Sequence, residues 1–419
     1  MAVYSYDESP SDLLGALENS GIDPGTAQFI QNVLQNKLPS DGQIPIELVT
    51  SPSAGINVPD VTFSDADDRG RHHPDQPEVL ILETSGNTVN TDRFPALQFI
   101  IQADPSTSSS LTITGHKSVY VATGDLAGTG NFKVTLDDSG NDTVKTGSGS
   151  DTVIGGSGAD SISVGDGNDD LLRAGSGAHQ TLQAGSGNND TLYGGSGSHD
   201  SIVAGNGSQD SMIAGTGSYQ TLSAGNGNND TLYGGSGSHD SIVAGNGNQD
   251  SLTAGTGSYQ TLGAGSGNND TLHGGSGSHD SIVAGSGDGD LLIGGSGDHQ
   301  TLSAGDGHND TLQGGSGTHQ LLEGGSGNDT FVAGTGGDTL LGGTGSDTFN
   351  VGVLGNDTID GGTGNNIVNF THNFSHVSLP SAPNAQGYYE IHFTDTGQTV
   401  WVKDIAHLYF GNDPTPHNP

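Results

Sequence analysis

The sequence predicts an all-β protein, a right-handed parallel β-solenoid with two strands per coil, and three observations support this prediction. Gly-x-Gly recurs from Gly147 to beyond Gly362, every nine residues, then every ten, then every nine again. Short fixed periods are typical of solenoids, whose repeats bury apolar side chains only against their neighbours. Each repeat places a large apolar residue two positions after an Asp or Gln, the spacing of one face of a strand. Folding the ten-residue repeats two per coil also separates them into two columns of different composition.

The composition limits the classes of function. The chain has 419 residues, of which 73 are Gly and none is Cys, and its formal net charge is −39. Such an acidic chain repels nucleic acid and anionic membranes and attracts metal cations, so divalent ions are the expected partners. We find neither an apolar run that could cross a membrane nor a basic segment followed by an apolar one near the start. We therefore expect no membrane insertion, no nucleic-acid partner and no cleavable signal peptide.

Three segments precede the repeats. Residues 1–40 are expected to be helical, because Ser11 can cap a first helix and Pro24 can open a second. Residues 41–77 are polar and contain Pro, and we interpret them as a linker or long loop. Residues 78–137 hold short β-branched and aliphatic runs without the glycine pattern, which predict strands that cap the N-terminal end of the solenoid.

The repeats themselves extend over residues 138–369. Three nine-residue units occupy 138–164, sixteen ten-residue units follow up to Gly324, and three more nine-residue units begin at Gly325. Residues 370–419 are aromatic, and we expect them to form a β cap over the otherwise open edges of the sheets.

The nine-residue units carry a motif of known chemistry. Residues 155–163 read Gly-Gly-Ser-Gly-Ala-Asp-Ser-Ile-Ser and match GGxGxDxUx, in which U is a large apolar residue; units at Gly325 and Gly343 are similar. The chain therefore resembles the RTX (repeats-in-toxin) family of glycine-rich calcium-binding β-rolls. The resemblance implies that calcium lies between stacked turns, bound by backbone carbonyls and Asp carboxylates. Oxygen ligands are those that this hard cation requires.

The C-terminal stretch adds to the resemblance and concerns localisation. Residues 389–410 are similar to the segment that ends many RTX proteins. This likeness implies export through type I secretion machinery with an uncleaved C-terminal signal. The expected localisation is therefore secreted, in the extracellular space or at the cell surface.

The candidate calcium ligands occupy one position of the repeat. In the nine-residue pattern they are Asp142, Asp151, Asp160, Asp329, Asp338, Asp347 and Asp357. In the ten-residue units one column, column A, carries Asp170, Asp190, Asp210, Asp230, Asp250, Asp270, Asp290 and Asp310, and Asp169 precedes the first of them. At a coil spacing of about 4.8 Å, uncompensated carboxylates would repel by roughly 3 kcal/mol per neighbouring pair at an effective dielectric near 20. Calcium is therefore favoured in column A.

A second interpretation of column A stays open, because the ten-residue units depart from the motif. They place two residues, instead of one, between the second Gly and the Asp, as Ser198 and His199 do before Asp200. In that interpretation each Asp accepts hydrogen bonds from amides of the turn and faces water.

The other column, column B, is mixed. At the Asp position it reads Gln180, Asp200, Gln220, Asp240, Gln260, Asp280, Gln300 and Gln320. The preceding residues are His179, His199, Tyr219, His239, Tyr259, His279, His299 and His319. These rings could bind a transition metal or stack along an edge. The two Tyr favour stacking, because a metal array would not gain from them.

The function follows from what the chain contains and lacks. We find no His-Glu-x-x-His, no Gly-x-Ser-x-Gly and no Cys nucleophile, so we expect no enzyme. Sixteen buried aliphatics cannot offset the entropy of ordering 160 residues, so bound cations must contribute to folding. The sequence predicts a calcium-binding structural protein, such as an S-layer, filament or biofilm component, that folds on calcium and forms a homo-oligomer or filament. The alternatives are an RTX-type adhesin or surface-binding module and, less favoured, an enzyme accessory or toxin-like effector.

Overall fold

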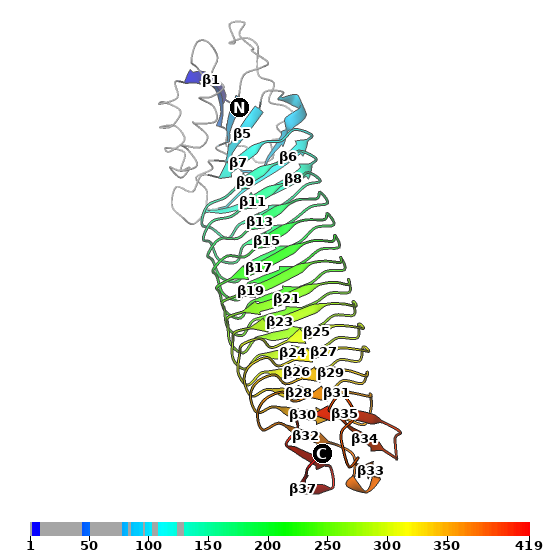
Figure 1. Ribbon diagram of the computed structural model, residues 1–419. Helices are drawn as coiled ribbons and strands as arrows, with labels where there is room; N and C mark the ends of the chain where they lie inside the picture. Colours follow the sequence, from blue (N-terminus) through cyan, green and yellow to red (C-terminus); the bar gives the residue numbers. More distant parts are fainter. Residues whose placement is uncertain are drawn as a thin grey trace. The chain divides into compact units, whose positions relative to one another are not determined.

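The computed structural model describes residues 2–8, 44–50, 78–82, 85–94, 97–102, 108–123 and 130–419. The chain divides into two compact units, Met1–Gly207 and Ser208–Pro419. In both, short strands alternate with turns (Figure 1). Helix occurs in the described residues only as two 3-10 turns, Thr91–Arg93 and Phe374–His376. None of the helices in this described part is long and apolar enough to span a membrane.

The first unit contains two sheets whose strands lie mostly parallel. One sheet contains β1 (Ala2–Glu8), β2 (Ile44–Thr50), β3 (Glu78–Leu82), β5 (Leu97–Gln102), β7 (Tyr120–Thr123), β9 (Thr143–Lys145), β11 (Ser161–Ser163), β13 (Thr181–Gln183) and β15 (Ser201–Val203). The other contains β4 (Asn87–Asn90), β6 (Ser108–Gly115), β8 (Asn131–Asp138), β10 (Thr152–Ile154), β12 (Leu171–Arg173) and β14 (Thr191–Tyr193). Only the pair β1 and β2 is antiparallel among these. The parallel stacking therefore begins before the first Gly-x-Gly.

Two sequence-based expectations are wrong at the start of the chain. Ala2–Glu8 is a strand inside the segment expected to be helical, and Ile44–Thr50 is a strand inside the segment expected to be a loop. Both stretches are rich in β-branched, aliphatic or aromatic residues, which favour strands, and each provides the other with a partner for backbone hydrogen bonds. The helices expected around Ser11 and Pro24 lie outside the described residues.

The second unit repeats the two-sheet arrangement. One sheet contains β17 (Thr221–Gly225), β19 (Ser241–Gly245), β21 (Thr261–Gly265), β23 (Ser281–Gly285), β25 (Thr301–Ser303), β27 (Leu321–Glu323), β29 (Thr339–Leu341) and β31 (Thr358–Asp360). The other contains β16 (Ser211–Ile213), β18 (Thr231–Tyr233), β20 (Ser251–Thr253), β22 (Thr271–His273), β24 (Leu291–Ile293), β26 (Thr311–Gln313), β28 (Thr330–Val332), β30 (Thr348–Val351) and β32 (Ile367–Phe370). Thr231 pairs with Ser251, twenty residues later, so each coil contributes one strand to each sheet. The predicted parallel β-solenoid with two strands per coil is confirmed.

Antiparallel strands follow the parallel stack at the C-terminal end. β35 (Thr399–Lys403) and β36 (His407–Phe410) form the last coil and pair in parallel with β31 and β32. β34 (Tyr389–Phe393) then pairs antiparallel with β35, and β37 (Asp413–His417) does so with β36. The short β33 (Val377–Ser378) pairs with β34. Each sheet therefore ends on a strand that does not continue the solenoid, which limits edge-to-edge pairing.

The core consists of the central residue of each strand. Leu232 in β18 and Ile242 in β19 are fully buried, as are their equivalents in the neighbouring coils. Near the end of the repeats aromatic side chains take this place, since Phe331 and Phe349 are fully buried and stack with their ring centroids 4.6 Å apart. One aliphatic side chain per strand is a small core for a chain of this length, so other interactions must hold the coils together.

Backbone contact between coils explains the Gly-x-Gly pattern. A Cβ added to Gly235, Gly257 or Gly287 would overlap the carbonyl oxygen of the Gly twenty residues earlier. No rotamer change relieves this overlap, because both groups belong to the main chain. The turns of successive coils therefore pack closely only while these positions remain Gly.

This packing predicts different effects for two glycines of the same coil. We expect Gly257→Ala to lower the free energy of unfolding by about 3 kcal/mol, the upper range for overpacking. Gly263 lies in β21 with nothing within 4 Å of an added Cβ, so Gly263→Ala should change stability by less than about 1 kcal/mol. Denaturant unfolding in calcium, followed by circular dichroism, measures both. Equal losses would contradict the close approach of the turns.

Candidate metal centre

A buried carboxylate directly precedes most strands of the repeats. Fifteen of the sixteen predicted ligands are at most 1% exposed. They are Asp142, Asp151, Asp160, Asp170, Asp190, Asp210, Asp230, Asp250, Asp270, Asp290, Asp310, Asp329, Asp338, Asp347 and Asp357. The strand pairing extends column A by Asp329 and Asp347 in the second unit, since β26, β28 and β30 are neighbours.

Asp169 is the exception among the predicted ligands. Its side chain is exposed, and its backbone has φ of 61°. The extra residue of nearly every ten-residue unit has the same left-handed conformation, as Asn189 does at 62°. Asn and Asp tolerate this conformation better than most residues. Asp169 is thus a turn residue, and the structure does not bring it together with the buried carboxylates.

One oxygen of the column A carboxylates, Oδ1, accepts a hydrogen bond from the backbone of a neighbouring coil. The backbone N–H of Asp250 donates to Oδ1 of Asp270 at 2.8 Å, and that of Asp270 donates to Oδ1 of Asp290 at 2.8 Å. In the first unit the N–H of Asp170 donates to Oδ1 of Asp190 at 2.9 Å. An acceptor at this position therefore satisfies a buried backbone donor in each coil.

The other oxygen, Oδ2, is buried without a hydrogen-bond partner. In column A of the second unit this applies to Asp230, Asp250, Asp270, Asp290, Asp310, Asp329 and Asp347. A buried charge without a partner destabilises the folded state strongly, unless a cation or a proton compensates it. The chain has only 9 Lys and Arg against 48 Asp and Glu, so its own cations cannot neutralise the columns.

Burial raises the pKa of these carboxyls far above the usual range. The pKa of Asp230, Asp290 and Asp329 rises to about 7, and that of Asp170 to about 8. Desolvation is the largest cause in each case, and repulsion by neighbouring carboxylates of the same column adds to it. The backbone N–H that bonds Oδ1 lowers the pKa without cancelling the rise. At neutral pH the carboxyl groups of column A are therefore stabilised by binding either a proton or a cation.

Carbonyl oxygens converge beside the unpaired Oδ2 atoms. A Cβ on Gly324 would lie 2.9 Å from Oδ2 of Asp329 and 2.6 Å from the carbonyl oxygen of Gly342 in the next coil. Among the residues that the structure describes, no three His, Cys, Asp or Glu side chains gather at one point. A cation would therefore take most of its ligands from backbone carbonyls, with one or two carboxylates. That oxygen-only set fits calcium.

Some buried acidic residues lie outside the predicted ligand set. Asp200, Asp240 and Asp280 of column B are buried. They occupy the same repeat position as the predicted ligands, so the sequence pattern could have identified them. Asp138 is also buried, and its pKa rises to about 6, mainly by desolvation. Asp138 ends β8 before the first repeat glycine, so the repeat pattern does not mark it.

The His and Tyr residues of column B stack. In the second unit Tyr219, His239, Tyr259, His279, His299 and His319 form a continuous series with ring centroids 4.8 to 5.3 Å apart. The angles between ring planes are 5 to 14°. In the first unit His179 stacks on His199 at 5.0 Å. The stacking expected from Tyr219 and Tyr259 is thus present. The stacked residues have a left-handed backbone, with φ of 65° at His239, and the ring contacts help to stabilise that conformation.

The fold and the buried columns define a class of protein, the calcium-binding parallel β-roll. The family model for the RTX calcium-binding nonapeptide repeat (4 copies) matches residues 137–171, 323–353 and 351–370. The matched segments of the chain are therefore RTX-type repeats, and calcium is the ion that such repeats bind. The matches leave most of the ten-residue units uncovered. None of the curated proteins is similar to this chain.

The raised pKa values predict how stability depends on pH when calcium is removed. Between pH about 4 and about 8 the folded carboxyls bind protons that the unfolded ones, with a pKa near 3.8, have lost. Stability should therefore fall as pH rises through this window and be highest near its acidic end. Circular dichroism in chelator from pH 5 to 8 should show a progressive loss of β structure. Stability that increases with pH in chelator would contradict the burial of ionised Asp.

Proposed function

We propose that this protein is an exported structural component of the cell surface or extracellular matrix that folds when it binds calcium. The observation that supports the proposal is the unbroken series of buried Oδ2 atoms in column A, from Asp230 to Asp347. Every added coil adds another buried carboxylate oxygen without a partner. Calcium therefore stabilises the folded state in every coil, and its absence favours the unfolded chain.

This dependence on calcium suits a protein that folds after export. An unfolded chain can pass through type I secretion machinery, and extracellular calcium modules work at about 10⁻⁴–10⁻³ M calcium. The net charge of −39 keeps the calcium-free chain extended by self-repulsion. Folding outside the cell then requires only the ion that the medium supplies.

The repetition supports a structural role. Residues 185–224 and 225–264 are nearly identical and each span two coils, so every second coil presents nearly the same side chains in the same order. A contact that one coil makes with another copy of the chain can be repeated two coils later. Such regularity favours assembly into a homo-oligomer or filament.

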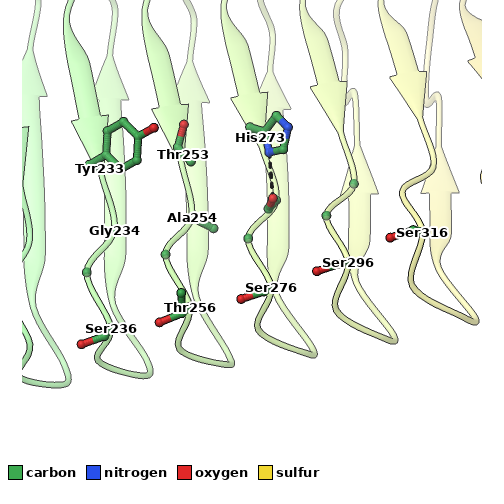
Figure 2. Close-up of a pocket in the computed structure, with 16 residues that line it drawn as sticks. Tyr233, Gly234, Ser236, Thr253, Ala254, Thr256, His273, Ser276, Ser296 and Ser316 are labelled. Atoms are coloured by element: carbon green, nitrogen blue, oxygen red, sulfur yellow. Dashed lines mark hydrogen bonds between the residues drawn. The ribbon is translucent and has the colours of Figure 1, made fainter.

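One observation favours the alternative function, a surface-binding module or adhesin. An open groove of about 720 Å³ runs along the turns that follow β18, β20, β22, β24 and β26. A row of hydroxyl groups along it comes from Ser236, Thr256, Ser276, Ser296 and Ser316, one per coil (Figure 2). Tyr233 lines the same groove and is 49% exposed. Hydroxyls beside an exposed aromatic ring suit a polar ligand such as a glycan.

A calcium titration after chelation tests both functions. We expect the chelated chain to be disordered, and calcium to produce β structure by circular dichroism together with a rise in light scattering. Folding without a rise in scattering would favour the surface-binding module over the self-assembling component. Full β structure in excess chelator at pH 7 would contradict the calcium-dependent fold.

Single substitutions test column A directly. Asp270→Asn keeps the Oδ1 acceptor of the Asp250 N–H but removes the charge, so we expect the calcium midpoint of folding to rise roughly tenfold, about 1.4 kcal/mol. Asp288→Asn is the matched control, because Asp288 is exposed and its Oδ1 accepts from the His308 N–H. Circular dichroism during calcium titration measures both midpoints. A tenfold shift in both variants would indicate an effect of net charge alone.

A further inference from the structure

The Gln residues of column B occupy the Asp position but place a donor where the Asp side chain has only acceptors. Oε1 of Gln300 accepts the backbone N–H of Gly295, in its own turn, at 2.7 Å. Nε2 of Gln300 donates to the carbonyl oxygens of Gly275 and Gly277 at 3.2 and 3.0 Å. These two carbonyls belong to the Gly-x-Gly of the preceding coil. The amide therefore joins two turns through carbonyl oxygens that calcium would otherwise use.

The same amide also reaches a carboxylate. Nε2 of Gln300 lies 3.2 Å from Oδ2 of Asp280, one coil earlier. The nitrogen thus lies among three oxygen atoms, two from glycine carbonyls and one from a carboxylate. This set has the composition of a calcium site, and an amide NH₂ is the neutral group that can donate two hydrogen bonds into it.

Other amides at the Asp position repeat this arrangement. Nε2 of Gln260 donates to the carbonyl oxygen of Gly237 at 3.0 Å, and Nε2 of Gln180 in the first unit donates to that of Gly158 at 3.2 Å. Asn366, which follows Asp347 in column A, donates through Nδ2 to the carbonyl oxygens of Gly361 at 2.7 Å and Asp404 at 3.2 Å. A side-chain amide therefore donates hydrogen bonds to carbonyl oxygens of the turns at both edges of the solenoid.

Column A of the ten-residue units has no such donor. The equivalent position in each coil is Asp, and Oδ2 of Asp270, Asp290 and Asp310 has no hydrogen-bond partner. The carboxyl group that replaces the amide adds a charge and removes the two donor hydrogens. In coils whose column B residue is Gln, the column B edge thus contains its own donor, and the column A edge requires an external cation. Column B also carries Asp200 and Asp240, whose Oδ2 atoms are buried without a hydrogen-bond partner as in column A.

We infer that the ten-residue units bind calcium along column A, and that each Gln amide of column B replaces an ion at the turns that it joins on the opposite edge. The inference rests on the proposed calcium dependence of column A. In the nine-residue units both edges carry Asp, as Asp329 and Asp338 do, and both bind calcium. Calcium per coil is therefore lower in the ten-residue units than in the nine-residue ones.

Reciprocal substitutions in the full chain test this inference. Gln300→Asp removes the amide donor, and native mass spectrometry of the calcium-loaded protein should count one more calcium ion per chain than in the wild type. Asp290→Gln supplies a donor in column A and should bind one ion fewer. Asp290→Gln should also melt at a higher temperature than the wild type in excess chelator. The exposed control Asp288→Asn should leave the ion count unchanged.

The outcomes separate the inference from the proposed function. A wild type that binds calcium, with an unchanged ion count in folded Gln300→Asp, overturns the inference alone. A wild type that binds no calcium overturns both. If Gln300→Asp does not fold at any calcium concentration, Asp290→Gln decides: an unchanged ion count or a lower melting temperature in chelator overturns the inference, and one ion fewer with a higher melting temperature supports it.

Discussion

The burial of a carboxylate before most strands of the repeats is the interaction on which the rest of the structure depends. Through Oδ1 the Asp side chain satisfies a backbone N–H of the neighbouring coil, as Asp270 does for Asp250, and so joins the coils. Through Oδ2 the same side chain introduces a charge that the protein does not compensate. The joining of coils is thereby linked to the presence of a cation. A core of one aliphatic side chain per strand, such as Leu232, leaves little other stabilisation.

The glycines and the carboxylates act together. Because Gly257 and its equivalents lack a Cβ, turn carbonyls approach the next coil closely enough to share a ligand with it. The side chain at the Asp position then decides how these carbonyls are neutralised, by an ion or by an amide such as that of Gln300. The aromatic series at the column B edge holds the turn residues with positive φ beside those amides. The two edges thus use different chemistry on the same backbone.

The periodic features were predictable from the sequence, and the non-periodic ones were not. A fixed interval between Gly-x-Gly pairs determines the coil, so the strand number per coil and the burial of Asp250 followed from the pattern. The strand pair Ala2–Glu8 and Ile44–Thr50 was missed because its partners are distant in sequence and belong to no repeat. Asp169 was misleading because its neighbour is the buried residue, and only the left-handed backbone at 61° distinguishes the two. The donor role of Gln300 depends on the direction of its side chain, which residue spacing does not reveal.

The twenty-residue pairing register also constrains how such a chain changes in length. Removing a single ten-residue unit would transfer every later repeat to the opposite sheet, placing Gln300 in line with Asp270 and Asp250 in place of Asp280 and Gln260. Removing twenty residues would keep each side chain on its own edge. The near identity of residues 185–224 and 225–264 corresponds to two complete coils. Duplication of whole coils keeps Asp and Gln on their own edges. A gene of this type can therefore encode a longer solenoid without any change to the residues that line either edge.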